Sequence, residues 1–235
     1  MMQTQASAEI FRSAWSVYDA IIELNYMAHR EIHALVRGAL AARAGRGAYR
    51  LLDLGCGNAR LLADTLREFP PAHYVGVDLS RPALDEATQQ LRGLPAVELR
   101  EQDMLSCVAS QADDSVDVIY SSFAMHHLST AEKTRLVVQI GRVLKPDGQL
   151  ILVDVVRAEG QSRDSYVREY REMMTRSWAD FAPEHIEQVW GHIAQFDYPE
   201  PVTSLAAMAR AAGLTEPNVL GQFGPHAAMT FALPR

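Results

Sequence analysis

The chain has 235 residues, a formal net charge of −7 and a pI near 5.6, with 48% hydrophobic and 22% charged residues. This composition excludes a disordered chain, and the acidic balance argues against a nucleic-acid partner, because binding to a phosphate backbone usually needs a basic face. The length suits one α/β domain with an elaboration, and we expect residues 1–235 to form a single domain.

Two cysteines and a polar N-terminus indicate the compartment. Cys56 lies in a glycine turn and Cys107 in a predicted loop, so no disulfide framework is expected and a reducing, cytoplasmic environment is the default. Residues 1–5 have neither a basic segment nor an apolar core, which predicts no signal peptide. No apolar run approaches the roughly 20 residues that a membrane-spanning helix requires, so we expect no membrane partner.

Residues 9–44 carry large side chains at steps of three or four, which predicts one helix face. That face is unusually aromatic and polar, and it includes Tyr18, Tyr26 and His29. Two interpretations stay open. The helix packs on the edge of the domain, or it forms a lid whose Tyr18, Tyr26 and His29 contact the substrate. The same face could also serve a homodimer.

A glycine turn follows this segment. The largely apolar residues 51–54 predict a strand, Gly55 and Gly57 interrupt it, and a helical pattern begins at once. Such a unit lets backbone N–H groups at the helix N-terminus face a ligand, and glycine permits close approach because it lacks a Cβ. A second strand, 73–78, ends in Asp78, about twenty residues further on, where an acid can reach ribose hydroxyls. These features predict a ligand that contains a nucleoside.

Strand and helix patterns alternate from residue 50 onward. Further strands are predicted at 96–101, 115–121 and 149–154, with helices between them. Alternation of this kind is typical of an α/β fold with a doubly wound, mostly parallel sheet. Ligands bind such sheets at the carboxyl ends of the strands. We therefore expect residues 50–156 to form a cofactor-binding core.

Residues 157–200 interrupt the alternation. They predict two helices, at 163–179 and 183–195, that are rich in large rings, including Tyr170 and Trp178. A helical elaboration without a function would carry fewer such rings. We interpret this insertion as a cap over the pocket and expect Tyr170 and Trp178 to contact the substrate.

Residues 201–235 close the predicted domain. A helix is expected at 203–212, followed by strands at 218–223 and 227–233 that form a hairpin. These two strands bring the predicted sheet to seven.

Five segments stand in a fixed order within residues 50–154. They are Leu51-Leu52-Asp53-Leu54-Gly55-Cys56-Gly57, Val75-Gly76-Val77-Asp78-Leu79-Ser80, Gln102-Asp103-Met104, Asp117-Val118-Ile119-Tyr120-Ser121 and Arg142-Val143-Leu144-Lys145-Pro146-Asp147-Gly148. Their order and character resemble the class I S-adenosylmethionine (SAM)-dependent methyltransferases. A lone Gly-x-Gly would be weak evidence for this family, whereas five matches in the same order are specific evidence. The resemblance implies a Rossmann-like methyltransferase fold, SAM as the cofactor and methyl transfer.

The resemblance implies roles for residues at the methionine end of SAM. Gly55, Cys56 and Gly57 would bring the main chain up to the methionine group, and Asp53 would hold its ammonium directly or through water. Ser121 would lie near the same group. An alternative for Asp53 is that it satisfies the amides of the turn.

The resemblance also implies roles at the adenosine end. Asp78 would accept hydrogen bonds from the ribose hydroxyls and Leu79 would contact the adenine face. Asp103 and the Met104 backbone would recognise the adenine edge. Arg60 occupies the position at which a dinucleotide fingerprint carries its third glycine, which disfavours a dehydrogenase.

His126 and His127 are the candidate catalytic residues. They follow the fourth predicted strand, in the loop that meets the substrate in the family that this sequence resembles. Histidine titrates near neutral pH and suits a general base, which is needed only if the nucleophile arrives protonated. The alternative is that one imidazole caps the next helix or packs under the loop.

The remaining histidines gave no clear functional signal. His185, His192 and His226 are scattered among predicted surface or cap elements, and we assign them no role. No group of His, Cys and carboxylate residues shows metal-ligand spacing along the sequence, so no metal site is expected.

The leading hypothesis is a methyltransferase that acts on an O, N or C atom of a small molecule. The acidic charge and the aromatic cover favour a small, partly apolar acceptor over RNA or DNA. The loop Ser121-Ser122-Phe123-Ala124 departs from the Asn-Pro-Pro-Tyr pattern of adenine or glutamine N-methylation. The alternatives are an NAD-dependent oxidoreductase and a non-catalytic SAM-binding partner protein. Both a monomer and a homodimer are compatible with the sequence.

Overall fold

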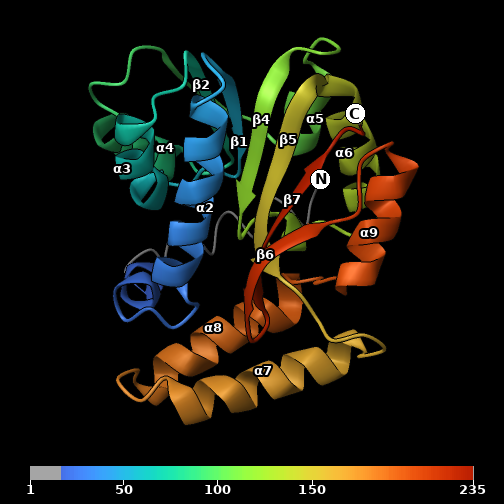
Figure 1. Ribbon diagram of the computed structural model, residues 1–235. Helices are drawn as coiled ribbons and strands as arrows, with labels where there is room; N and C mark the ends of the chain where they lie inside the picture. Colours follow the sequence, from blue (N-terminus) through green and yellow to red (C-terminus); the bar gives the residue numbers. More distant parts are fainter. Residues whose placement is uncertain (1–16, 235) are drawn as a thin grey trace.

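The computed structural model describes residues 17–234, in which a central sheet lies between two groups of helices (Figure 1). Within this range, seven strands form one sheet in the order β3-β2-β1-β4-β5-β7-β6. Adjacent strands pair in parallel, except that β7 runs antiparallel to both β5 and β6. The predicted doubly wound, mostly parallel sheet is therefore confirmed. The strands are β1 (Arg50–Leu54), β2 (His73–Asp78), β3 (Val97–Glu101), β4 (Val116–Ser122), β5 (Leu144–Val155), β6 (Asn218–Phe223) and β7 (His226–Ala232).

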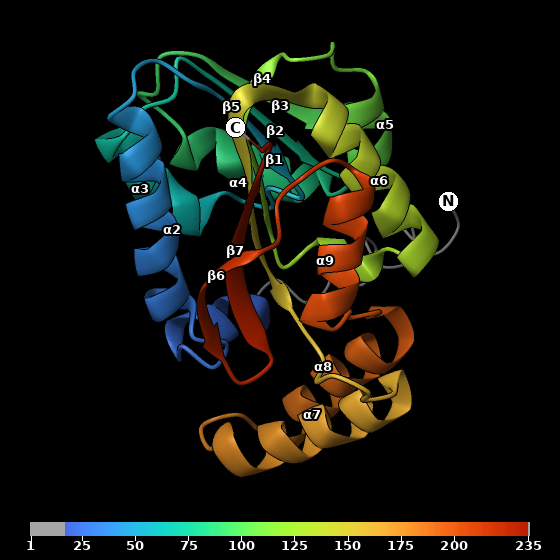
Figure 2. The ribbon, with the colours of Figure 1, turned by 45° about the vertical axis from the view of Figure 1, so that its right-hand side comes forward.

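Helices cover both faces of the sheet (Figure 2). Buried side chains of α2, α3 and α4 join one hydrophobic cluster, and those of α5, α6 and α9 join the other. This division follows from the amphipathic helices, because each must bury one apolar face against the sheet. The helices are α2 (His29–Ala44), α3 (Arg60–Glu68), α4 (Arg81–Gln90), α5 (Met104–Ala109), α6 (Thr130–Val143) and α9 (Val202–Ala211).

Local sequence signals set the helix starts as expected. Ser80 caps α4, its side chain accepting a hydrogen bond from the Ala83 N–H, and Pro82 stands in the first turn. Ser129 and Glu132 form the predicted capping box at the start of α6. These caps hold the loops that precede both helices in defined positions.

Two helices, α7 (Arg163–Ser177) and α8 (Pro183–Phe196), form the predicted insertion. Figure 1 shows them across the end of the molecule toward which β4 and β5 point. The chain leaves β5 to build this helix pair and returns to the sheet through α9. The carboxyl ends of the central strands are thus covered by α7 and α8.

Two structural predictions were wrong. The predicted continuous helix over 9–44 is interrupted: residues 17–23 are helical, a turn follows with Asn25 and Ala28 at positive φ, and α2 begins at His29. Residues 9–16 lie outside the described range. Cys107 lies buried in α5 and not in a loop, because the side chain of Asp103 caps this short helix.

Among the helices of residues 17–234, none combines the length and apolar character needed to cross a bilayer.

Candidate functional site

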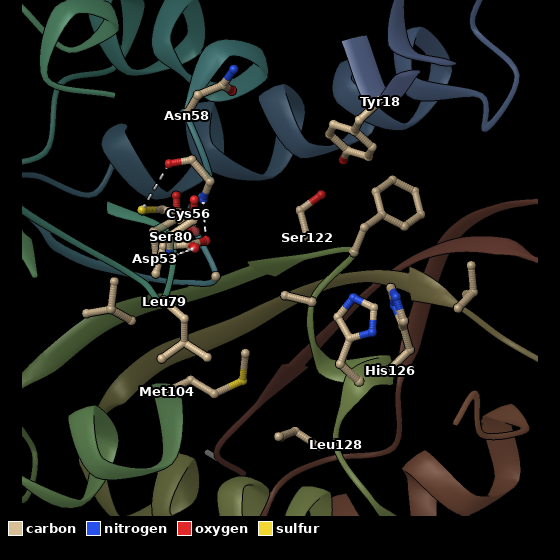
Figure 3. A pocket seen from close by; sticks show the side chains of 18 of the residues that line it. Tyr18, Asp53, Cys56, Asn58, Leu79, Ser80, Met104, Ser122, His126 and Leu128 are labelled. Carbon is tan, nitrogen blue, oxygen red and sulfur yellow. Dashed lines mark hydrogen bonds between the residues drawn. The ribbon is translucent and has the colours of Figure 1, made fainter. Parts of the chain in front are cut away.

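A cavity of about 600 Å³ lies at the carboxyl ends of β1, β2 and β4. Residues of the helical segment 17–23, α5, α7 and α8 complete its wall. The cavity thus adjoins both the glycine turn and the insertion. Figure 3 shows Asp53, Cys56 and Ser80 on one side of the cavity and His126 on the other, with Ser122 between them. Eight of the nine predicted cofactor residues line it: Asp53, Gly55, Cys56, Gly57, Asp78, Leu79, Asp103 and Met104.

The glycine turn brings main chain to the cavity wall. Gly55 and Gly57 have φ values of +74° and +52°, in the left-handed region that glycine adopts without strain. A Cβ on Gly55 would lie 2.4 Å from the Cβ of Ala124. The N–H groups of Gly55 and Cys56 both donate to the Val77 carbonyl at 2.9 Å, which fixes the turn against β2. The backbone at this turn is therefore free of side-chain bulk where it meets the cavity.

Asp53 offers a buried acceptor at this end of the cavity. Its Oδ2 accepts a hydrogen bond from the Tyr74 hydroxyl at 2.7 Å. Its Oδ1 has no hydrogen-bond partner among the described residues, and the side chain is buried. Burial raises the pKa of Asp53 to about 7, although the Tyr74 hydroxyl opposes this shift. An unsatisfied buried carboxylate oxygen is costly, and a cationic ammonium would relieve that cost.

Asp78 connects the second strand to the glycine turn. Its Oδ2 accepts from the Gly57 N–H at 2.9 Å and its Oδ1 from the Ser80 N–H at 2.8 Å. Burial raises its pKa despite these hydrogen bonds. Asp103 similarly caps α5 by accepting from the Ser106 N–H at 2.9 Å. Both carboxylates reach the cavity from neighbouring strand ends, the arrangement expected for contacts to an adenosine.

Ser121 is the predicted cofactor residue that does not line the cavity. Its side chain is fully buried and its hydroxyl donates to the Leu54 carbonyl at 2.9 Å. The next residue, Ser122, lines the cavity instead. Successive side chains of a strand point to opposite faces, so only the position of β4 in the sheet decides which serine faces the ligand. Ser122 thus takes the position that was expected for Ser121.

His126 lies between two buried acids. It belongs to the short 3-10 helix η1 (Met125–His127), and its Nδ1 lies 2.5 Å from Asp154 Oδ1 at the end of β5. Its Nε2 lies 3.7 Å from Asp197 Oδ1, just after α8. Burial by itself lowers the pKa of His126, but the charges of Asp197 and Asp154 outweigh it and raise the pKa above its ordinary value. The site therefore favours an imidazole that readily takes up a proton.

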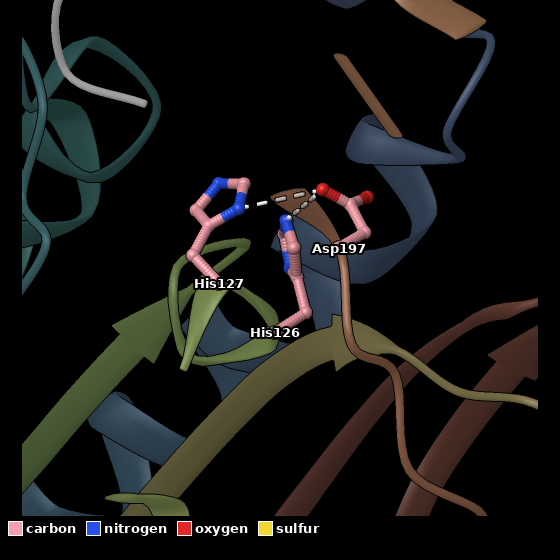
Figure 4. A group of neighbouring side chains, drawn as sticks. All are labelled: His126, His127 and Asp197. Atoms are coloured by element: carbon pink, nitrogen blue, oxygen red, sulfur yellow. Dashed lines mark ion pairs between the residues drawn. The ribbon is translucent and has the colours of Figure 1, made fainter. Parts of the chain in front are cut away.

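Asp197 gathers two more imidazoles around the same oxygen. Its Oδ1 lies 3.3 Å from His127 Nδ1 and 3.8 Å from His192 Nε2. Figure 4 shows His126 and His127 both directed toward this carboxylate. Burial alone raises the pKa of Asp197, but the neighbouring imidazoles, His126 first, outweigh it and lower the pKa. Asp197 is thus a carboxylate anion that three histidines surround.

The same cluster has metal-ligand dimensions. One ligand atom each from His126, His127 and Asp197 lies within 4.8 Å of the others. The sequence showed no such spacing because Asp197 comes from the insertion, far along the chain. A metal ion is thus an alternative occupant, which removal of metal would test. The bond between His126 and Asp154 is equally expected of an imidazole held for proton transfer.

Sequence reasoning missed three residues of this cluster. Asp154 ends a predicted strand beside the strand that precedes His126, so its position at a carboxyl end was an available signal. Burial lowers the pKa of His192, which was assigned no role, to about 4, and its side chain lines the cavity. Asp197 had no local signal at all, since only the packing of α8 against η1 brings it to His126.

The predicted substrate residues divide into two groups. Tyr18, Tyr170 and Trp178 line the cavity. Tyr26 and His29 are absent from its lining. Tyr26 stacks on Trp178 with ring centroids 4.9 Å apart and planes 6° apart. His29 is buried edge-on against Phe123, and burial lowers its pKa to about 4. Both therefore support wall residues from behind.

Arg60, which stands where a dinucleotide fingerprint carries glycine, ties the N-terminal helix to the glycine turn. Its guanidinium lies 3.2 Å from Asp19 and 3.1 Å from Glu23. All three side chains are partly exposed, so these pairs contribute little stability individually. They do hold the helix that carries Tyr18 next to the start of α3.

Comparison with known proteins agrees with this geometry. Residues 51–148 match the model of a family described as a methyltransferase domain. The chain is 31% identical over 124 residues to the uncharacterized methyltransferase YcgJ of Bacillus subtilis (strain 168), covering 52% of this chain and 47% of that protein. It is 29% identical over 143 residues to a malonyl-(acyl-carrier protein) O-methyltransferase of Halalkalibacterium halodurans, covering 60% and 51%. The chain thus spans about half the length of these relatives.

A solved structure covers nearly the whole chain. The complex of DhpI with SAH aligns with a TM-score of 0.65 at 19% identity and covers 99% of this chain and 98% of that one. At this identity the likeness bears on the fold, which is the seven-stranded sheet with flanking helices described above. Together, the five ordered sequence segments, the sheet topology and the domain match over residues 51–148 support a class I SAM-dependent methyltransferase.

Proposed function

We propose that this protein transfers the methyl group of SAM to a hydroxyl oxygen of a small molecule and that His126 is the general base. The observation that carries the proposal is the position of His126 between Asp154 and Asp197, on the wall of the cavity that also contains the glycine turn. A base is needed when the nucleophile arrives as a hydroxyl, and an imidazole held between two carboxylates suits that task.

The cofactor end of the cavity fits SAM. The free Oδ1 of Asp53 would accept from the ammonium of the methionine group, and the backbone of Gly55 and Gly57 would approach the same group. Asp78 would contact the ribose, and Asp103, with Leu79 and Met104, would surround the adenine. When bound, SAM supplies an electrophilic methyl group on a sulfonium.

The two acids select the tautomer of His126 and stabilise its protonated form. Because the Asp154 carboxylate can only accept, it selects the neutral imidazole that carries its hydrogen on Nδ1 and leaves Nε2 with a lone pair. Asp197 then stabilises the imidazolium that forms when Nε2 takes a proton. General-base catalysis of this kind contributes roughly 10²- to 10⁴-fold to the rate.

A small acceptor agrees with the volume and the charge. The cavity of about 600 Å³ must hold both SAM and the acceptor, so the space that remains for the acceptor is that of a small molecule. The net charge of −7 does not suit a nucleic-acid partner.

We place the protein in the cytoplasm, where its buried Cys56 and Cys107 stay reduced. Residues 17–23, the described start of the predicted 9–44 lid, would cover the cavity with Tyr18, and residues 157–200 would act as the cap over the 50–156 core.

The test separates cofactor binding from chemistry. His126→Asn and wild type are titrated with SAM by calorimetry, and both are assayed for S-adenosylhomocysteine with a panel of phenols, aliphatic alcohols, amines and carboxylic acids. We expect equal SAM affinity and at least a hundredfold lower turnover for His126→Asn. Turnover that survives this substitution would show that His126 is not the base.

Two alternatives are tested by the same samples. An oxidoreductase would be stabilised against heat by NAD and not by SAM, since a ligand that binds only the native state raises the melting temperature. A non-catalytic SAM-binding protein would bind SAM and yield no methylated product from any acceptor.

A further inference from the structure

We propose that the acceptor is an uncharged phenol whose ring lies against Phe123, Tyr170 and Trp178 while its hydroxyl meets His126. This assignment rests on the proposed O-methylation and names its substrate class. Three features of the far half of the cavity carry it: a braced aromatic wall, the absence of basic residues from the cap side, and the strength of a histidine base.

The aromatic wall is held from behind by His226. The Tyr170 hydroxyl lies 2.8 Å from His226 Nε2, and both groups are buried. The rings of Phe123 and Tyr170 meet the His226 ring edge-on, with centroids 6.0 and 5.8 Å away. Burial lowers the pKa of His226 to about 3, so it stays neutral near pH 7. Because the Tyr170 hydroxyl is engaged with His226, what Tyr170 offers a ligand is its ring.

Trp178 extends this wall at the end of α7. Its indole stacks on Tyr26 and meets Phe181 edge-on with centroids 5.6 Å apart. The Tyr26 hydroxyl accepts a hydrogen bond from the Asp180 N–H at 3.0 Å, which holds the stack in place. A fixed set of rings on several sides favours a flat ligand, since aromatic pairs gain about 0.5–1.5 kcal/mol beyond burial of their area.

The charge of this half disfavours an anionic acceptor. No lysine or arginine of α7 or α8 lines the cavity in the described chain, and the two arginines of its wall come from α3 and α6. Arg60, the one on α3, is paired with Asp19 and Glu23. The groups that flank His126 are instead the acids Asp154 and Asp197. A carboxylate or phosphate acceptor beside His126 would meet these acids, and no lysine or arginine of α7 or α8 would compensate its charge, which is a penalty against that class.

The acidity of the hydroxyl favours a phenol over an aliphatic alcohol. A phenol such as the tyrosine side chain has a pKa of about 10, and a free histidine about 6.5. Water, a guide to aliphatic hydroxyls, has a pKa of about 15.7. The proton of a phenol is thus within a few pKa units of a free imidazole, and the imidazole of His126 lies between Asp154 and Asp197, which stabilise its protonated form. The pKa of an aliphatic hydroxyl is about nine units above that of a free histidine.

The reaction balances with the groups present. The phenol oxygen forms a bond to the methyl carbon as the carbon–sulfur bond breaks, and the electron pair of that bond stays on sulfur. The phenol proton passes to His126 Nε2 and then to solvent. The products are an aryl methyl ether and S-adenosylhomocysteine.

Matched acceptors test the assignment. Initial rates of S-adenosylhomocysteine formation are measured with phenol, 2-naphthol and hydroxyanthraquinone, and with 2-naphthoic acid, 2-naphthylamine and decahydro-2-naphthol as counterparts. We expect kcat/KM for the best phenol to exceed that of every counterpart at least tenfold, with the methyl group found on oxygen by mass spectrometry. A counterpart that reacts faster than all three phenols, or no product from any phenol while SAM binds, overturns the phenol assignment.

Repeating the best reaction with His126→Asn separates this proposal from the function on which it rests. If a saturated alcohol is preferred and its turnover needs His126, O-methylation stands and the phenol assignment fails. If a phenol is methylated equally well without His126, the assignment of the base fails and the substrate class stands.

Substitutions of Trp178 in the cap and of Phe123 after β4 test the aromatic wall. Trp178→Leu and Phe123→Leu should each raise KM for the best phenol at least tenfold while the Kd for SAM stays within twofold. Trp190→Leu is the matched control, because Trp190 lies in the same cap and does not line the cavity. Circular dichroism checks the fold of each variant, and Trp178→Phe, which keeps a ring, should recover most of the loss. If folded Phe123→Leu and Trp178→Leu both keep the wild-type KM, these rings do not contact the phenol.

Discussion

The Nδ1 atom of His126 and the Oδ1 atom of Asp154 lie 2.5 Å apart, and both side chains are buried. Asp154 lies at the end of β5. His126 lies in η1, which follows β4, and β4 is a parallel neighbour of β5 in the sheet. The fold thus places a charged acceptor behind an imidazole that faces the cavity, and the consequences of this pairing can be measured.

Asp154→Asn should lower kcat by a factor on the order of 10²–10⁴, because an amide can present either an oxygen or an N–H and no longer selects the tautomer with Nε2 unprotonated. SAM affinity should not change. Rapid-mix assays of S-adenosylhomocysteine formation measure the rate, and calorimetry measures the affinity. Asp164→Asn, on the exposed first turn of α7, is the control and should behave as wild type. A normal rate in Asp154→Asn would show that this hydrogen bond does not serve catalysis.

The rate should fall as the pH is lowered, and the fall should begin above pH 6.5, which is the ordinary pKa of histidine. The base must be neutral, and the charges of Asp197 and Asp154 outweigh burial and raise the pKa of His126, so protonation removes activity at a higher pH than for a free imidazole. Asp197→Asn takes away one of these charges and should move the acid limb of kcat/KM to lower pH. A limb that stays in place would show that Asp197 does not act on His126.

SAM should bind more weakly below about pH 7. Burial raises the pKa of Asp53 to about 7, so at lower pH the carboxyl is protonated and must lose its proton before it can pair with the ammonium. Calorimetry at pH 6 and pH 8, in buffers of different ionisation enthalpy, reports both the affinity and the proton released. Asp53→Asn should bind SAM at least tenfold more weakly at pH 8 and lose the pH dependence. Retention of this dependence in Asp53→Asn would assign it to another group.

Two glycine substitutions should differ in cost although the φ values at the two positions are alike. Gly55 and Gly160 have φ values of +74° and +73°, but only at Gly55 would a Cβ meet another atom, Ala124 Cβ at 2.4 Å. Gly160→Ala should lower the free energy of unfolding by about 1–2 kcal/mol, the cost of a left-handed residue. Gly55→Ala should lose about 1–3 kcal/mol more through overpacking and bind SAM poorly. Urea unfolding measures both, and equal losses would place the clash elsewhere.

Metal removal should leave the activity unchanged. Dialysis against EDTA and 1,10-phenanthroline, followed by metal analysis of the protein, tests whether the cluster of His126, His127 and Asp197 holds an ion. We expect full turnover and no stoichiometric metal, because the acids around His126 are sufficient to hold it for proton transfer. Loss of activity that Zn²⁺ or Mn²⁺ restores would replace the general-base assignment with a metal site.

The cofactor half could be predicted from the sequence because its signals are local. Gly55 and Gly57 follow the first strand, Asp78 ends the second and Asp103 comes shortly after the third, so residue order alone places them at one edge of a parallel sheet. The capping box of Ser129 and the helices of the insertion were equally readable. Each of these features depends on neighbours within a few residues along the chain.

The acceptor half was decided by tertiary structure. Asp197 reaches His126 only because α8 packs beside η1, and nothing near Asp197 in the sequence indicates that contact. Whether Ser121 or Ser122 faces the cavity depends on how β4 sits in the sheet, and Tyr26 and His29 lie behind the wall because a turn divides the predicted N-terminal helix. The sequence by itself determined the fold and the cofactor, whose contacts are set by short-range backbone conformation. The geometry of catalysis depends on side chains from distant segments, and packing alone brings those together.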